Sequence, residues 1–407
     1  MLSWKLKTSN YLPIGLDIGH SSIKMIQLAV IGSQMSVVAA DKVTINYDAG
    51  ANDMQRKDLV ISAIKQVLAN NRFCGRDVVS CVPNDKLKIT SLRLADTETA
   101  QIEEFLKKEV VNRFGLDPDK DSIHYLTAGS VRQGDEVRNE LILFATDNET
   151  IKSHLTMLEE AGLRPVAIDT VPCALFRSFE RLLRRQEDRE RTVVFVNVAS
   201  RFTTVVFGRG AEISFVKHMP IGGEKFNREI AFKLGININE VQALRNKLQE
   251  QNNLISSADR NPAAAADKNE SASIEDSGQG SQGRKLDDST KQVIADTLNS
   301  VAEELAREVS LCFRYYTVTF RGKRVDKMVL AGGQAYEDIL LNVLKKQLAV
   351  EIELAQPLRG FDTAGIRYVD RRGLFCEWAV AVGLSLKGWD GSAGQTAAEA
   401  ILTGTAL

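Results

Sequence analysis

Two stretches about half the chain apart share one pattern: an apolar strand, a turn of small polar residues and a second strand. The first reads IGLDIGHSSIKMIQL at residues 14–28, and the second reads FVNVASRFTTVVF at residues 195–207. The aligned pairs are Asp17 with Asn197, Gly19 with Ala199, and Lys24 with Thr204. A repeat at this distance predicts two related halves, each of which contributes one hairpin to a shared cleft.

Either hairpin taken alone is also explained as a tight surface turn, because Gly, Asp and Ser favour turns. The alternative is a phosphate site. Small residues let backbone N–H groups approach phosphate oxygens, Ser21 and Ser22 add hydroxyl donors, and Lys24 supplies positive charge. Asp17 would then face a magnesium ion and hold it through water. The presence of two matching hairpins favours the phosphate site.

The rest of the chain alternates between strand-like runs and helical periodicity, which predicts an α/β fold. The expected helices cover residues 60–68, 97–115, 151–162 and 294–312. The expected strands include residues 78–83, 141–146 and 325–331.

Two glycine pairs stand where a strand gives way to a helix, in PIGGEKFNREIAF at residues 220–232 and in LAGGQAYEDILLNVL at residues 330–344. Glycine lets a flat nucleoside lie against bare backbone, and a helix N-terminus attracts phosphate. Each pair alone is an ordinary turn. Their order after the two hairpins is what points to a nucleotide.

Composition excludes several function classes. Lys and Arg total 52 against 53 Asp and Glu, so no net charge attracts nucleic acid or an anionic membrane. The five cysteines show no zinc spacing, and the four histidines form no H-E-x-x-H motif or triad-like group. The first residues lack the apolar run of a signal peptide or membrane span. We therefore expect a cytosolic protein.

We expect a first domain over residues 1–186, with a small inserted subdomain near 96–140, and a second domain over 187–390. Residues 251–284 contain almost no large apolar side chain, which predicts a disordered insertion, and residues 391–407 are expected to form a flexible tail. The insertion includes GQGSQG, a literal match to the dinucleotide fingerprint. The strand that this fingerprint requires is missing, so we discount it.

The order of these features resembles the actin-like ATPase superfamily, and within it the PilM family of type IV pilus assembly proteins. The resemblance extends from Leu12 to Lys387. It rests on GLDIGHSSIK, LILFATDNETIKSHLTMLEEAGLRPVAIDT, FVKHMPIGGEKFNREIA, KMVLAGG and WAVAVGLSLKG. It implies two related domains with a nucleotide cleft between them and an inserted small α/β subdomain.

The resemblance also implies ATP and magnesium as cofactors. By position, phosphates would be contacted from the first hairpin, and the ribose and adenine would be framed by the two glycine-pair segments. The expected cofactor-binding residues are Asp17, Gly19, Ser21, Ser22, Lys24, Asn197, Gly222, Gly223, Glu224, Lys225, Gly332 and Gly333. Asp17 is the expected magnesium residue, and no catalytic residue is assigned.

The expected partner is the N-terminal cytoplasmic tail of a PilN-like inner-membrane protein, captured in a groove that the inserted subdomain helps to form. Other pilus assembly and motor proteins are further expected partners. The resemblance implies a cytoplasmic protein that meets the inner membrane only through its partners, and it leaves room for a homo-oligomer or ring.

Both hairpins depart from the family pattern. Asn197 stands where the second hairpin normally carries an acidic residue, with Ala199 in place of the following glycine, and His20 replaces a small residue. An amide brings no negative charge, so magnesium binding and activation of a water should both suffer. We therefore expect a nucleotide-stabilised scaffold with little or no hydrolysis, at most a slow ATPase.

Three other interpretations remain open. A sugar kinase would need a carboxylate base where Asn197 lies. An FtsA-like filament-forming ATPase would be expected to end in an amphipathic membrane helix, whereas this chain ends GSAGQTAAEAILTGTAL. A nucleotide-free adaptor of the same fold is the third.

Overall fold

The structure is a computed structural model with two five-stranded sheets and one three-stranded sheet. It describes residues 9–32, 34–45, 53–95, 102–133, 136–183, 188, 190–245, 247–248, 287–320, 323–366 and 373–389. The insertion expected to be disordered (251–284) and the expected tail (391–407) lie outside the described residues.

The first sheet has the strand order β3-β2-β1-β4-β8. Its strands are β1 (Ser9–Ile18), β2 (Ser22–Ile31), β3 (Gln34–Thr44), β4 (Asp77–Cys81) and β8 (Arg164–Asp169). The pairs β1/β2 and β2/β3 are antiparallel, whereas β1/β4 and β4/β8 are parallel. Helices α1 (Asp53–Asn70) and α3 (Asn148–Glu160) bury their apolar sides against this sheet.

The second sheet repeats this topology, with the order β11-β10-β9-β12-β13. Its strands are β9 (Thr192–Val198), β10 (Thr203–Arg209), β11 (Glu212–Met219), β12 (Lys327–Ala331) and β13 (Glu351–Leu354). The strand directions also match: two antiparallel pairs precede two parallel ones. The two halves therefore fold alike.

The register of the two hairpins reproduces the alignment made from the sequence. Asp17 is paired with Lys24 in the β1/β2 hairpin. Asn197 is paired with Thr204 in the β9/β10 hairpin. The two turns therefore occupy the same place in their respective halves.

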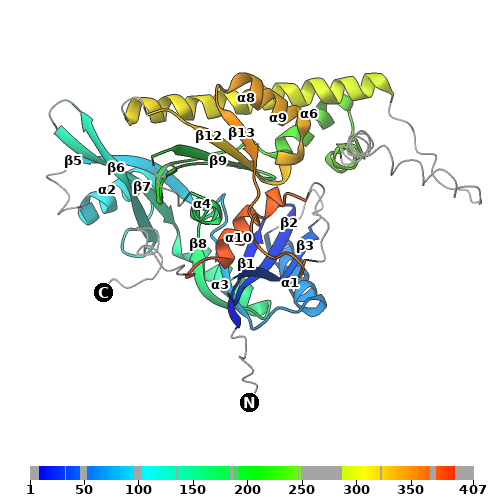
Figure 1. Cartoon of the computed structure of the whole chain (residues 1–407), viewed down its shortest axis with the longest axis horizontal. Helices are drawn as coiled ribbons and strands as arrows, with labels where there is room; N and C mark the ends of the chain where they lie inside the picture. Colours follow the sequence, from blue (N-terminus) through cyan, green and yellow to red (C-terminus); the bar gives the residue numbers. More distant parts are fainter. Residues whose placement is uncertain are drawn as a thin grey trace, which may run out of the picture.

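Helices on the second half form its outer layer, with α8 along one side of the molecule (Figure 1). They are α6 (Gly223–Leu234), the 32-residue α8 (Asp288–Thr319) and α9 (Asp338–Gln347). Their apolar residues join one large core with β9, β10 and β12. The spacing at residues 294–312 predicted α8, although the structure extends it at both ends.

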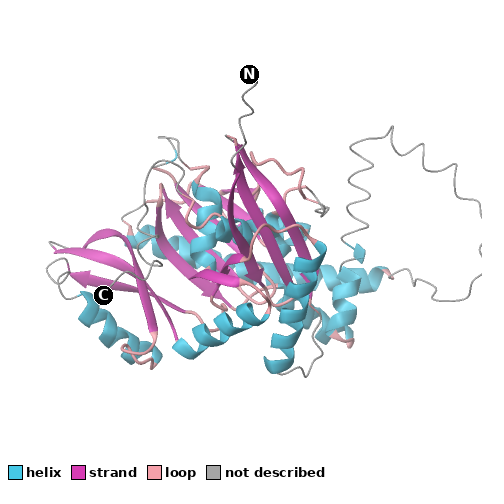
Figure 2. Cartoon of the chain, turned by 90° about the horizontal axis from the view of Figure 1, so that it is seen from below, coloured by secondary structure: helices cyan, strands magenta, loops and turns pink. Residues whose placement is uncertain are grey.

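The three-stranded sheet has the order β5-β7-β6 and lies to one side of the other two (Figure 2). Its elements are β5 (Lys88–Ala95), α2 (Ile102–Phe114), β6 (Ser122–Gln133) and β7 (Glu136–Thr146). One face packs on α2, and the other joins the core of the second half. The sequence predicted the helix of this module and one of its three strands.

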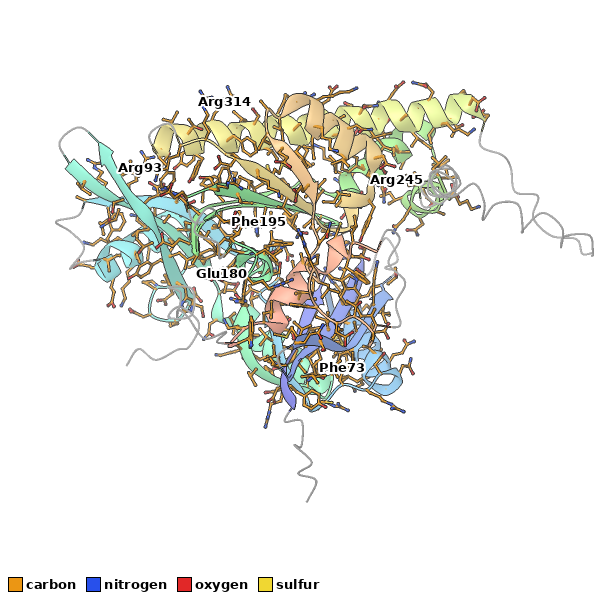
Figure 3. All side chains as sticks on the ribbon, in the orientation of Figure 1. Phe73, Arg93, Glu180, Phe195, Arg245 and Arg314 are labelled. Atoms are coloured by element: carbon orange, nitrogen blue, oxygen red, sulfur yellow. The ribbon has the colours of Figure 1, made fainter. Side chains whose placement is uncertain are left out.

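A polar cluster around the buried Glu140 ties the small sheet to the end of α8. Arg93 Nε donates to Glu140 Oε2 at 2.8 Å, and Tyr315 donates to Glu140 Oε1 at 3.1 Å. Arg93 also donates to Thr319 Oγ1 at 3.0 Å. Figure 3 shows Arg93 on the small sheet beneath α8. The module is thus inserted into the first half of the chain but packs against the second.

Helices α4 (Val171–Glu180) and α10 (Ala379–Ser385) lie between the two large sheets (Figure 1). Gly383 brings α10 so close to α4 that an added Cβ would lie 2.6 Å from the carbonyl carbon of Ala174 and closer still to its oxygen. Arg177 spans this crossing, because it donates to Asp169 at 2.7 Å and to the Gly383 carbonyl at 3.0 Å.

We predict that Gly383→Ala lowers the free energy of unfolding by about 1–3 kcal/mol, the usual effect of overpacking. Gly333→Ala is the matched control, since its Cβ would meet no atom nearer than 4.0 Å. Urea denaturation of both variants measures the difference. Equal stability of the two variants would contradict the close crossing.

Candidate functional site

A cavity of about 890 Å³ lies between the two halves of the protein and is lined by residues of both hairpins. Of the residues expected to bind a nucleotide, those that line it are Asp17, Gly19, Ser21, Ser22, Lys24, Asn197, Gly223, Gly332 and Gly333. Segments far apart in the sequence are therefore brought together around one space.

The first hairpin forms a tight turn at one wall of the cavity. Its turn is closed by the Gly19 amide, which donates to the Ser22 carbonyl at 3.0 Å. Below the turn, Lys24 Nζ lies 3.3 Å from Asp17 Oδ2, and only 7% of Lys24 is exposed. This ion pair places one negative and one positive group side by side where the sequence predicted a metal and a phosphate.

The second hairpin carries neutral side chains at the two positions equivalent to Asp17 and Lys24. Asn197 is buried, and its Oδ1 faces Gly332, where an added Cβ would lie 2.7 Å from it. Gly332 also adopts a φ of 92°, which favours glycine. The hydroxyl of Thr204 is buried and has no hydrogen-bond partner among the described residues. Amide and hydroxyl groups thus replace the acid–lysine pair of the first hairpin.

The start of α6 is only partly at the cavity. Gly222 is its N-cap and packs on the second hairpin, and Gly223 donates to the Ala199 carbonyl at 3.0 Å. Glu224 and Lys225 are not in the cavity lining. Lys225 instead binds Glu304 on α8 at 2.7 Å. The proposed ribose and adenine contacts of Gly222, Glu224 and Lys225 therefore stay predictions, and the geometry supports Gly223 best.

Four polar residues that the sequence analysis did not single out line the cavity beside Gly332 and Gly333: Asn227, Gln242, Arg245 and Gln334. Arg245 is 6% exposed and donates to Asn227 Oδ1 at 2.6 Å, Gln334 Oε1 at 2.9 Å and Glu337 Oε2 at 3.0 Å. Figure 3 shows Arg245 beneath the helices of the second half. A lone arginine in a polar helical stretch carries no sequence signal of this role.

Outside the cavity lining, Glu224 contacts one residue of each hairpin. Arg201 Nε donates to Glu224 Oε2 at 2.8 Å, and His20 Nε2 lies 3.8 Å from the same oxygen. Burial, followed by the positive charges of Arg201 and Arg56, lowers the pKa of His20 to about 4. His20 is therefore neutral at pH 7.

Cationic side chains outnumber acidic ones around the cavity. The cationic residues are Lys24, Lys42, Arg56, Lys57, Lys86, Arg201 and Arg245. The acidic residues are Asp17, Asp85, Asp147, Glu149 and Glu377. A space of this size and sign suits an anionic ligand such as a nucleotide phosphate.

The donor set fits magnesium only in part. The described residues contain no group of three or more His, Cys, Asp or Glu side chains placed to hold a metal. Magnesium at phosphate sites needs one or two carboxylates and keeps several waters. Asp17 can supply one carboxylate, but Asn197 offers an uncharged oxygen where the second would stand.

The fold defines the class of protein: two sheets of one topology that share a cavity form the actin-like ATPase fold, as expected from the sequence. The family model described as type IV pilus assembly protein PilM matches residues 15–254 and 272–389. The chain therefore belongs to the PilM family of type IV pilus assembly proteins.

A solved structure supports the same fold. A PilM–PilN type IV pilus biogenesis complex matches with 18% identity and a TM-score of 0.66, over 92% of this chain and 98% of that chain. The ethanolamine utilization protein EutJ from Carboxydothermus hydrogenoformans matches with 13% identity and a TM-score of 0.48. That match covers 93% of this chain and 90% of the other.

His154 on α3 lines the cavity and supports a pH prediction. Ser80 Oγ donates to the Leu16 carbonyl at 3.0 Å and lies 3.2 Å from His154 Nε2, so the neutral ring is the donor in this contact. Burial lowers the pKa of His154 to about 4. Unfolded His154 binds a proton near pH 6.5, so stability should fall as the pH drops from 6.5 to 4.

We predict that His154→Gln reduces this acid slope by about 1.4 kcal/mol per pH unit, the contribution of one proton. Urea denaturation between pH 7 and 4.5 measures it. The variant should still lose some stability in acid, because the pKa values of His20 and His218 are also lowered to about 4. Parallel curves for variant and wild type would contradict the assignment.

Proposed function

We propose that this protein is an ATP-binding scaffold of the type IV pilus inner-membrane assembly complex, which captures the N-terminal tail of a PilN-like protein and hydrolyses ATP slowly or not at all. The observation that carries the nucleotide part is the convergence of both hairpins on one cavity of about 890 Å³. Membership of the PilM family supports the proposed role in type IV pilus assembly.

In this proposal the triphosphate lies at the two hairpins. Ser21 and Ser22 offer hydroxyl donors, Gly19 keeps the turn free of a side chain, and Lys24 offers charge. Asp17 would hold magnesium through water. The ribose and base would lie toward Gly223, Gly332 and Gly333, where glycine leaves the backbone without a side chain.

Slow hydrolysis follows from the second hairpin. Attack on a γ-phosphate needs a group that orients or deprotonates the water, and metal charge to offset the developing negative charge. Asn197 provides neither a basic carboxylate nor a negative ligand. The bound nucleotide would then act by stabilising the closed arrangement of the two halves, as any ligand of the folded state does.

Capture of a PilN-like tail is supported by the family and by the likeness to the PilM–PilN complex. The small sheet β5-β7-β6 has two edge strands, β5 and β6. An extended peptide can add to such an edge through main-chain hydrogen bonds. Other pilus assembly and motor proteins would bind elsewhere, and a homo-oligomer or ring is compatible with this role.

A place at the inner membrane would come from the partner. No helix among the described residues is long and apolar enough to cross a membrane. We propose that the protein is cytoplasmic and peripherally associated with the inner membrane. An adaptor of the same fold without nucleotide is the second candidate, because the Asp17–Lys24 pair already neutralises both charges.

We predict that ATP with magnesium raises the thermal midpoint of the full chain. At an ATP concentration a hundred times the dissociation constant, the free energy of unfolding should rise by about 2.7 kcal/mol. Lys24→Ala should remove most of this shift. Lys327→Ala is the control, because Lys327 pairs with Glu353 outside the cavity lining and its loss should leave the shift intact.

Absence of any shift in the wild-type protein would favour the nucleotide-free adaptor. A second outcome would also remove part of the proposal. Brisk ATP hydrolysis that Asp17→Ala abolishes would show an enzyme rather than a scaffold.

We predict that a synthetic N-terminal tail of the PilN-like protein from the same organism binds the full chain, whereas a scrambled peptide does not. Isothermal titration calorimetry measures binding. Hydrogen exchange should show protection within residues 88–133, at an edge of the small sheet. Protection confined to other elements would place the groove elsewhere, and no binding would reject the PilN assignment.

A further inference from the structure

Positive side chains from both halves line the cavity. Arg201 belongs to the second hairpin, and Arg56 belongs to α1 of the first half. Both line the cavity, and the positive charge of each lowers the pKa of His20 in the first hairpin. The hairpin that lacks an acidic residue at position 197 thus carries an arginine four residues later.

The acidic side chains of the cavity are largely engaged by protein groups. Asp17 is paired with Lys24 at 3.3 Å, and Glu377 is paired with Lys42 at 2.7 Å. Asp147 caps α3 by accepting the Thr150 amide hydrogen at 2.7 Å. These carboxylates have positive or N–H partners already, which weakens their ability to hold a hydrated cation.

We propose that this chain neutralises the phosphates of its nucleotide with side-chain cations from both halves, principally Lys24 and Arg201, so that binding does not require a divalent cation. This inference rests on the nucleotide site proposed above. Lys24 and Arg201 together carry two formal positive charges, as one magnesium ion does. Each is also paired with a carboxylate, Lys24 with Asp17 at 3.3 Å and Arg201 with Glu224 at 2.8 Å, so a phosphate would share these cations with the protein. They also come from opposite walls, as the two metal-facing carboxylates would.

The geometry of Arg201 suits this role. Its bond to Glu224 uses Nε, so the two terminal nitrogens of the guanidinium can face an anion in the cavity. A guanidinium donates two parallel hydrogen bonds to a phosphate, which a hydrated metal ion does not do. Glu224 accepts the bond from Arg201 through Oε2, whereas Arg228 donates to its other oxygen, Oε1, at 2.9 Å.

The test measures the affinity of the full chain for ATP by calorimetry, once with magnesium and once with EDTA. We expect the two dissociation constants to agree within about threefold. The corresponding difference in binding free energy is well under 1.4 kcal/mol. Arg201→Ala should weaken ATP binding by about tenfold in both buffers, the effect of losing a charge-assisted hydrogen bond.

Arg228→Ala is the matched control: it removes the same charge and a partner of the same Glu224, but Arg228 does not line the cavity. Its affinity should equal that of the wild type. Circular dichroism melts confirm that each variant is folded, and Arg201→Gln replaces any variant that is not. Equal losses for Arg201→Ala and Arg228→Ala would overturn the role of Arg201.

Asn197→Asp provides an independent test, because it restores a carboxylate beside the phosphate position. We expect EDTA to weaken ATP binding to this variant by about tenfold. Wild-type binding that is lost in EDTA would overturn the inference and leave the ATP-binding scaffold intact. Absence of binding in either buffer would reject the nucleotide site itself.

Discussion

The double-sided packing of α4 is the interaction on which the rest of the structure depends. One side of α4 meets α10, where Gly383 allows the two backbones to touch. The other side sends Phe176 and Phe179 into the second core, where Phe179 stacks on Phe195 with ring centroids 5.1 Å apart. A helix that belongs to both cores holds the two sheets at a set separation. The cavity exists because this separation leaves the hairpins facing each other across open space.

The charge pattern of the cavity follows from the repeat and from its divergence. The two related hairpins place two turns at one cavity, and the two turns differ in the charge of their side chains. The first keeps an acid and a lysine in register, Asp17 and Lys24, whereas the second pairs Asn197 with Thr204. The second half compensates with Arg201. A site of this kind can hold an anion firmly and still lack the groups that activate water.

The sequence predicted the actin-like ATPase fold and both hairpins because these depend on local patterns: apolar runs, small turn residues and their order. The structure differs from the prediction where tertiary contacts determine the direction of a side chain. The phase of α6 directs Lys225 toward Glu304 rather than toward the cavity, although IGGEK reads as one motif. Arg245 is drawn into the site by Asn227 and Gln334, which a linear pattern does not connect. Two strands of the small sheet were missed because helical and polar residues surround them.

The small sheet links the two halves in a way that bears on the cavity. Its chain leaves the first half after β4 and returns before α3, yet Arg93 and Glu140 attach it to α8 of the second half. Val82 and Leu87, in the segment that leads into it, lie in the core of the second half. Any change in the separation of the halves must therefore be absorbed where the small sheet joins β4 and α3. Asp147, which caps α3 at that junction, also lines the cavity. A shift of the small sheet should therefore be accompanied by a change in the width of the cavity.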